Sequence, residues 1–128
     1  MKPIVKSEFK SVLSYITKDG SEIRELMHPS VHGNKNQSLA SAIIAVGKET
    51  LWHKHIATEE LYHVVSGTGL MHIDGDEFEV NPGDTILIEP GLPHKIKNTA
   101  VEPLQILCAS SPPYSHDDTV LLADELSR

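Results

Sequence analysis

The stretch LWHKHIATEELYHVVSGTG, residues 51–69, carries two histidines one residue apart, His53 and His55, followed by the carboxylates Glu59 and Glu60. Imidazole nitrogens and carboxylate oxygens are common ligands of divalent metal ions, and a strand places residues i and i+2 on one face. The two imidazoles would start about 7 Å apart at the backbone, near enough to converge on one ion. The alternative is a solvated strand face without any ligand role. The choice depends on whether the sequence supplies further ligands.

Two more residues complete a candidate set of four ligands. Glu60 belongs to the next predicted strand, where alternation puts it on one face with Tyr62, and antiparallel pairing can bring that face opposite the two histidines. His94, in GLPHKIKN, follows a turn of prolines and glycine whose stiff backbone fixes the direction of its strand. For the other five histidines we expect surface or packing roles: His28, His32, His63, His72 and His116.

Short strands separated by turn signals must position these residues. Between residues 39 and 110 the strand-like segments are LASAIIAV, TLWHKHI, ELYHVVSG, GLMHI, DEFEV, DTILIEP, HKIKNT and PLQILCAS. Asp74-Gly75 is a strong hairpin signal, because a type I′ turn needs positive φ at both central positions. Short, evenly spaced strands without helical stretches between them favour an antiparallel sandwich or closed barrel.

The two ends of the chain follow less regular patterns. Asp19-Gly20 separates VLSYITK from SEIRELM and favours a hairpin over residues 12–27, although nearby apolar residues also fit helical spacing: Phe9, Val12, Leu13 and Ile16. We expect extended structure there, and a polar loop at residues 28–38. SPPY breaks the chain at residues 111–114, and a short helix capped by Ser115 or Asp117 is expected to follow.

Composition excludes several classes of protein. The chain has 128 residues, 39% of them hydrophobic and 23% charged, which is typical of a single globular domain. Its net charge of −7 argues against nucleic acid or an anionic membrane as partner. MKPIVKSEFK has no apolar region of a signal peptide, and no apolar run is long enough to span a membrane. Cys108, the single cysteine, suits a reducing compartment, so we expect a cytoplasmic protein.

In two motifs the chain resembles the cupin superfamily. GKETLWHKHIATEELYHVVSG agrees with the first cupin motif, G-x5-H-x-H-x(3,4)-E-x6-G, with Gly47 and Gly67 at its ends. Glu59 fits the distance from the histidines but not the distance to Gly67, so Glu60 is preferred. GDTILIEPGLPHKIKN approaches the second motif, G-x5-P-x-G-x2-H-x3-N, except that Glu89 stands at the first proline position.

The resemblance implies an all-β fold, a double-sheet jelly-roll barrel with short irregular or helical terminal segments. Residues 1–128 would form one cupin domain, with an N-terminal extension at 1–38, a core at 39–110 and a C-terminal tail at 111–128. It also implies one divalent metal ion (Fe, Mn, Zn, Ni or Co) bound by His53, His55, Glu60 and His94. Such a ligand set keeps at least one position open for water or substrate. Asn98 of the second motif is expected to hold a turn or backbone group instead of metal.

The cupin fold does not fix the reaction, because cupins include enzymes of several classes as well as binding proteins. We expect a metal-dependent enzyme acting on a small polar or anionic organic molecule by oxygenase, isomerase or lyase chemistry. The alternative is a non-catalytic, metal-assisted small-molecule binding or sensor cupin. Strand alternation predicts a substrate pocket lined by Tyr62, Met71, Ile96, Gln105 and Leu107. Tyr62 is the candidate catalytic acid or base, with a plain wall residue as the alternative.

Exposed sheet edges of a small jelly roll predict a homodimer. Apolar sheet surface and unpaired strand edges need covering, and small cupins are commonly dimers with exchanged N-terminal strands. Residues 1–38 are the segment expected to make this contact.

Overall fold

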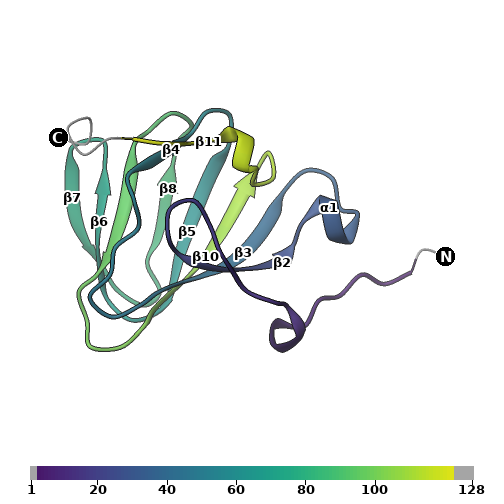
Figure 1. Ribbon diagram of the computed structural model, residues 1–128, viewed down its shortest axis with the longest axis horizontal. Coiled ribbons are helices and arrows are strands. Elements are labelled where there is room, and N and C mark those ends of the chain that lie inside the picture. Colours follow the sequence, from purple (N-terminus) through teal and green to yellow (C-terminus); the bar gives the residue numbers. More distant parts are fainter. Residues whose placement is uncertain (1–2, 123–128) are drawn as a thin grey trace.

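Two antiparallel sheets face each other in the computed structural model, which describes residues 3–122 (Figure 1). The first sheet contains, in spatial order, β1 (Tyr15–Ile16), β2 (Glu22–Met27), β3 (Ser38–Ile44), β10 (Leu104–Ser111), β5 (Glu59–Ser66) and β8 (Thr85–Ile88). The second contains β11 (Thr119–Leu121), β4 (His53–His55), β9 (His94–Asn98), β6 (Gly69–Ile73) and β7 (Asp76–Val80). The prediction of an all-β, double-sheet jelly roll is therefore confirmed.

The chain crosses between the two sheets after most strands. It passes from β3 in the first sheet to β4 in the second, and returns through residues 56–58 to β5 in the first. The two halves of the first motif therefore lie on facing walls of the sandwich. The second motif begins at β8 in the first sheet and ends with β9, which pairs with β4.

The hydrophobic core fills the space between the sheets, because each strand turns alternate side chains inward. On β5 the buried positions are Glu60, Tyr62 and Val64, and Ile106 is buried beside them on β10. The second sheet contributes side chains that are fully enclosed, including Met71 on β6. Burial of such apolar area, at about 25 cal/mol per Å², is the main force that holds the two sheets together.

The backbone geometry of two turns requires the residues found there. Asp74 and Gly75 both have positive φ, 52° and 127°, as the predicted tight turn between β6 and β7 requires. Gly67, the last residue of the first motif, has a φ of 88°, and an added Cβ there would lie 2.8 Å from the Pro103 carbonyl oxygen. Any other residue at 67 would be strained and would also clash with the neighbouring backbone.

The N-terminal region is extended, as predicted, and β1 pairs with β2 in a hairpin around Asp19 and Gly20. A 3-10 turn, η1 (Phe9–Ser11), precedes it. The segment predicted as a polar loop contains a one-turn helix, α1 (Pro29–His32). The helix forms because the His28 side chain accepts a hydrogen bond from the Ser30 amide, and proline suits its first turn.

The C-terminal tail differs from its prediction. Ser115 caps a helix as expected, but this is only the 3-10 turn η2 (His116–Asp118), and the chain then continues as β11 along the edge of β4. The tail forms a strand instead of a helix because pairing with the edge of β4 satisfies backbone groups that a short helix would leave free. Residues 123–128 of the predicted helix lie outside the described residues. None of the helices within residues 3–122 is long and apolar enough to cross a membrane.

Candidate metal centre

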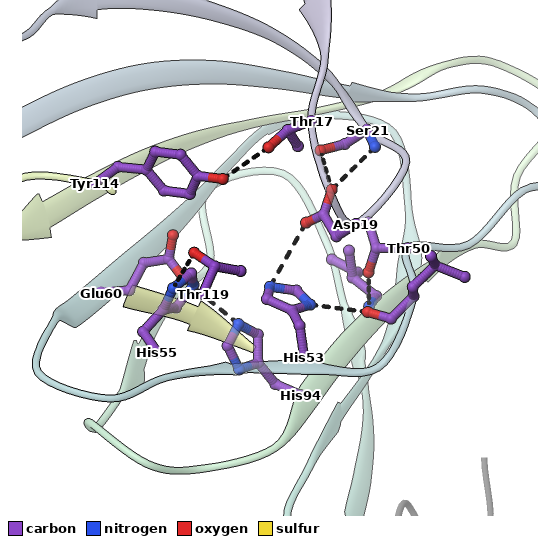
Figure 2. Close-up of polar contacts among 12 residues, drawn as sticks. Thr17, Asp19, Ser21, Thr50, His53, His55, Glu60, His94, Tyr114 and Thr119 are labelled. Atoms are coloured by element: carbon purple, nitrogen blue, oxygen red, sulfur yellow. Dashed lines mark hydrogen bonds and ion pairs between the residues drawn. The ribbon is translucent and has the colours of Figure 1, made fainter. Parts of the chain in front are cut away.

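Three histidines and a glutamate converge between the two sheets (Figure 2). His53 and His55 project from the same face of β4, and His53 lies directly opposite His94 on β9. One ring nitrogen from each histidine lies within 4.8 Å of the other two. Glu60 reaches this group from β5 in the facing sheet, with its Oε1 3.2 Å from His55 Nε2 and 3.4 Å from His94 Nε2. All four side chains are buried.

Hydrogen bonds orient two of the imidazoles through their Nδ1 atoms. His53 Nδ1 lies 2.8 Å from the Leu51 carbonyl oxygen, and His94 Nδ1 lies 2.9 Å from the Leu92 carbonyl oxygen. A carbonyl oxygen can only accept, so Nδ1–H is the donor in both contacts. In the neutral ring, Nε2 therefore presents a lone pair to the centre of the group.

A side chain from the C-terminal strand orients the third imidazole. His55 Nδ1 lies 3.1 Å from Thr119 Oγ1, and that hydroxyl donates its own hydrogen to the Ser115 carbonyl oxygen at 2.9 Å. The hydroxyl therefore accepts from His55, and Nε2 of the neutral ring again faces the centre. Strand β11, which sequence patterns missed, thus completes the support of the site.

The converging atoms fit a divalent cation. Within residues 3–122, His55 Nε2, His94 Nε2 and Glu60 Oε1 are buried and have no hydrogen-bond partner. Burying such an atom unpaired costs about 1–3 kcal/mol. Adjacent ligand atoms around an ion at about 2.1 Å lie about 3.0–3.4 Å apart, close to the contacts seen here. An ion at this point would turn the unpaired lone pairs into metal bonds.

Burial and mutual contacts set the charges of the site. Burial, together with the neighbouring His94, lowers the pKa of His53 to about 4, so this ring is neutral at pH 7. Burial opposes the charge of Glu60, but contacts with His55 and His94 outweigh it and lower the Glu60 pKa to about 2. Burial likewise opposes the charge of His55, yet Glu60 raises the His55 pKa. A carboxylate and an uncharged ring are the forms that metal ligation needs.

Residues outside the cluster lie where alternation predicts. Glu59 is exposed on β5, on the face opposite Glu60. His63 is exposed on the same strand, and its Nδ1 lies 2.8 Å from Thr85 Oγ1. His72 packs edge-on against Trp52 with ring centroids 5.7 Å apart. The N-terminal and C-terminal histidines make hydrogen bonds away from the cluster, namely His28, His32 and His116.

Asn98 ends β9 and bonds to backbone groups, as predicted. Its Nδ2 donates to the carbonyl oxygens of Ile44 at 3.0 Å and Glu102 at 2.8 Å, and its Oδ1 accepts from the Ala100 amide at 2.9 Å. The side chain is 2% exposed. Asn98 therefore replaces missing backbone partners at the end of the strand.

A cavity extends from the histidine cluster between β10, β3 and the β1–β2 hairpin. Its apolar wall is formed by Ile23, Ala40, Ala42, Ile44, Ile106 and Cys108. Its polar side carries the carboxylates of Asp19, Glu25 and Glu60 and the rings of Tyr15, Tyr62 and Tyr114. Among the residues that line it within 3–122 there is no lysine or arginine.

The lining of this cavity differs from the predicted pocket at four positions. Tyr62 borders the cavity. Gln105 and Leu107 lie on the opposite face of β10 from Ile106, and the Gln105 amide contacts Ser41 there at 3.2 Å. Both faces of β10 carry apolar residues, so the sequence does not reveal which face turns inward. The other two residues, Met71 and Ile96, are fully buried in the core and do not line the cavity.

Two polar residues at the site escaped the sequence analysis. Asp19, interpreted only as a turn residue, has Oδ2 3.5 Å from His53 Nε2. Tyr114, assigned to the tail, lines the cavity, and its hydroxyl lies 2.8 Å from Thr17 Oγ1. Neither residue belongs to a motif, and both reach the site only through tertiary contacts. No local signal in the sequence could have found them.

With this geometry established, comparisons with known proteins identify the family. The model of the Cupin domain matches residues 40–110, more than half of the chain. The chain therefore belongs to the cupin family, and the resemblance of its two motifs is confirmed.

Known relatives extend the similarity over most of the chain. An uncharacterized protein of Methanocaldococcus jannaschii is 55% identical over 119 residues, 93% of this chain and 95% of that protein. An oxalate-binding protein of Thermotoga maritima is 28% identical over 86 residues, 67% of this chain and 71% of that protein. The polyketide cyclase RemF of Streptomyces resistomycificus has a similar structure, with a TM-score of 0.75 and 20% identity over 99% of this chain and 90% of the cyclase. At that identity the structural likeness concerns the fold alone.

Proposed function

We propose that the chain is a metal-dependent cupin enzyme in which His53, His55, Glu60 and His94 hold one divalent ion. The observation that carries the proposal is the convergence of the three histidines, together with buried lone pairs of His55, His94 and Glu60 that have no hydrogen-bond partner within residues 3–122. Fe²⁺, Mn²⁺, Co²⁺ or Ni²⁺ would keep two positions open in octahedral geometry, and Zn²⁺ bound by fewer of these ligands would keep at least one. When bound, such an ion supplies Lewis-acid or oxygen chemistry to a molecule at the open position.

The cavity favours a particular kind of substrate. Three carboxylates line it and, among its described lining residues, there is no lysine or arginine to balance a strongly anionic molecule. The apolar wall suits a hydrocarbon body, while the metal would take one oxygen of the molecule. We therefore narrow the substrate to a small neutral or singly charged polar molecule. A dianion such as oxalate, which the name of the Thermotoga relative mentions, has less support here.

Within this proposal Tyr62 acts as the general acid. Its side chain is 3% exposed and borders the cavity, and its ring centroid lies 6.0 Å from that of His94. Burial raises the pKa of Tyr62 well above its usual value, so the phenol keeps its proton in the metal-free protein. A phenol in that form is able to donate a proton to a substrate beside the metal.

A binding protein is the second candidate function. It is supported by the oxalate-binding relative, whose name describes binding without a reaction. The two functions differ in what becomes of a bound molecule: a binding protein releases it chemically unchanged. Incubation of the metal-loaded protein with each bound compound, followed by mass spectrometry, separates the two.

Elemental analysis of protein purified without added metal tests the shared metal site. We expect about one ion per chain in the wild type, and loss of the ion in His55→Ala and His94→Ala. The matched control is His63→Ala, since His63 is an exposed histidine on β5. Equal metal content in all four proteins would rule out this ligand set.

We also propose that the protein is a cytoplasmic homodimer with a small-molecule ligand and no nucleic-acid or membrane partner. The net charge of −7 supports the last point, and the single cysteine supports a reducing compartment. Support for the dimer comes from apolar side chains that the N-terminal segment leaves exposed. Ile4 is 93% exposed, Leu13 89% and Ile16 66%.

A further inference from the structure

The β1–β2 hairpin lies beside the histidine cluster, and three consecutive residues hold it in place. Thr17 Oγ1 lies 2.8 Å from the Tyr114 hydroxyl. Lys18 Nζ donates to the carbonyl oxygens of His116 at 2.7 Å and Thr119 at 3.1 Å. The Asp19 carbonyl oxygen accepts from the Leu51 amide at 2.8 Å. The tip of the hairpin therefore has a defined position beside strands β4 and β11.

The Asp19 side chain points from this tip toward the cluster (Figure 2). Its Oδ1 accepts two hydrogen bonds from Ser21, from the amide at 3.0 Å and from the hydroxyl at 2.6 Å. Oδ2 receives no hydrogen bond from the described residues and lies 3.5 Å from His53 Nε2. The carboxylate is thus held by one oxygen, and the other is aimed at a metal-facing nitrogen. The side chain is only 12% exposed.

The facing atoms of Asp19 and His53 repel each other unless a cation lies between them. His53 uses its Nδ1–H for the Leu51 carbonyl oxygen, so Nε2 of the neutral ring carries a lone pair. Asp19 Oδ2 lies 3.5 Å from His53 Nε2. Glu60 Oε1 has a similar relationship to His55 Nε2 and His94 Nε2, at 3.2 and 3.4 Å. Glu60 approaches the histidines from β5, and Asp19 approaches His53 from the hairpin.

We propose that Asp19 is a fifth protein ligand of the metal ion, delivered by the β1–β2 hairpin. The proposal rests on the proposed function, since it requires an ion at the histidine cluster. Five protein ligands leave one exchangeable position in an octahedral site. Two carboxylates also neutralise a dication, so the centre carries no net charge to attract a dianion. A neutral or singly charged molecule that binds through one oxygen is the substrate class that such a centre takes.

Water proton relaxation of the Mn²⁺-loaded protein tests this ligand directly, because it counts the exchangeable water molecules on the ion. We expect one water in the wild type and two in Asp19→Asn. The asparagine keeps an oxygen for Ser21 and so preserves the turn while removing the charged ligand. Mn²⁺ affinity should fall about tenfold or more in this variant. The matched control is Glu25→Gln, which removes a carboxylate from the same cavity and should leave the water count at one.

The outcomes separate this inference from the proposed function. Two exchangeable waters in the wild type, or the same number in wild type and Asp19→Asn, would overturn the role of Asp19 alone. A wild-type chain that binds no Mn²⁺ and no other divalent ion would overturn the proposed function and the fifth ligand together. An increase in Glu25→Gln equal to that in Asp19→Asn would show a general effect of cavity charge and would also overturn the inference.

Discussion

His53 on β4 and His94 on β9 face each other directly across a strand pair, with ring centroids 4.2 Å apart. This one pairing joins the two cupin motifs, which are far apart in the sequence. Because β4 also has an outer neighbour, β11, the rings are supported from both sides of the strand. The geometry of the site therefore depends on strand register in the second sheet as much as on the ligands themselves.

Removing the hydroxyl that orients His55 should weaken metal binding. Thr119 Oγ1 accepts from His55 Nδ1 at 3.1 Å, so Thr119→Val leaves the ring without its orienting partner. We expect metal affinity to fall about 10–100-fold, the usual effect of losing such a contact. Thr119→Ser keeps the hydroxyl and should bind nearly as tightly as the wild type. Competition with a chromophoric chelator measures both, and equal affinity for valine and serine would contradict the role of Thr119.

His53 should make the metal-free protein less stable in acid. Its pKa is about 4 in the folded protein against a usual value of 6.5, so the unfolded chain binds a proton that the folded chain excludes. The contribution to stability is therefore complete above pH 6.5 and is lost as pH falls toward 4. In His53→Gln, the free energy of unfolding, measured by denaturant titration, should depend less steeply on pH between 6.5 and 4. Parallel pH curves for variant and wild type would show that His53 is not buried as a neutral ring.

Asn98→Ala should destabilise the fold and leave the metal bound. The substitution removes hydrogen bonds to the carbonyl oxygens of Ile44 and Glu102 and one from the Ala100 amide. Leaving such groups unpaired costs about 1–3 kcal/mol each when they are buried, so we expect a total loss of about 3 kcal/mol. Chemical denaturation measures the loss of stability, and elemental analysis measures the metal content. A variant that folds as stably as the wild type would refute the turn-holding role.

The predicted dimer can be tested at the exposed apolar residues before β2. Light scattering should give a mass of twice the 14.1 kDa chain for the wild type. The double variant Leu13→Asp, Ile16→Asp places charges on side chains that are 89% and 66% exposed and should give a monomer. Val101, 96% exposed in a loop, provides the control Val101→Asp, which should remain dimeric. A monomeric wild type would rule out the proposed homodimer.

Sequence patterns predicted the parts of the structure in which local rules decide the outcome. Alternation on β5 put Glu60 inward and Glu59 outward, and the turn at Asp74 formed as its φ requirement predicts. The inward face of β10 was not predictable, because Gln105 and Leu107 lie among apolar residues on both faces. Contacts between residues far apart in the sequence were not predictable either, because they depend on how the elements pack. Asp19 acquires its chemistry only when the hairpin tip is placed beside His53.

Tyr62→Phe tests whether the chemistry of the site needs a proton donor besides the metal. Tyr62 is enclosed beside the cluster, so the phenylalanine ring fills the same volume and the fold should be retained. Because Tyr62 contributes no proposed metal ligand, metal content should also be unchanged. Once a substrate is identified, turnover should fall about 100-fold, the usual contribution of a positioned acid or base. Near-full activity would show that Tyr62 only lines the cavity and is not the general acid. A metal-bound water would then be the candidate for proton transfer.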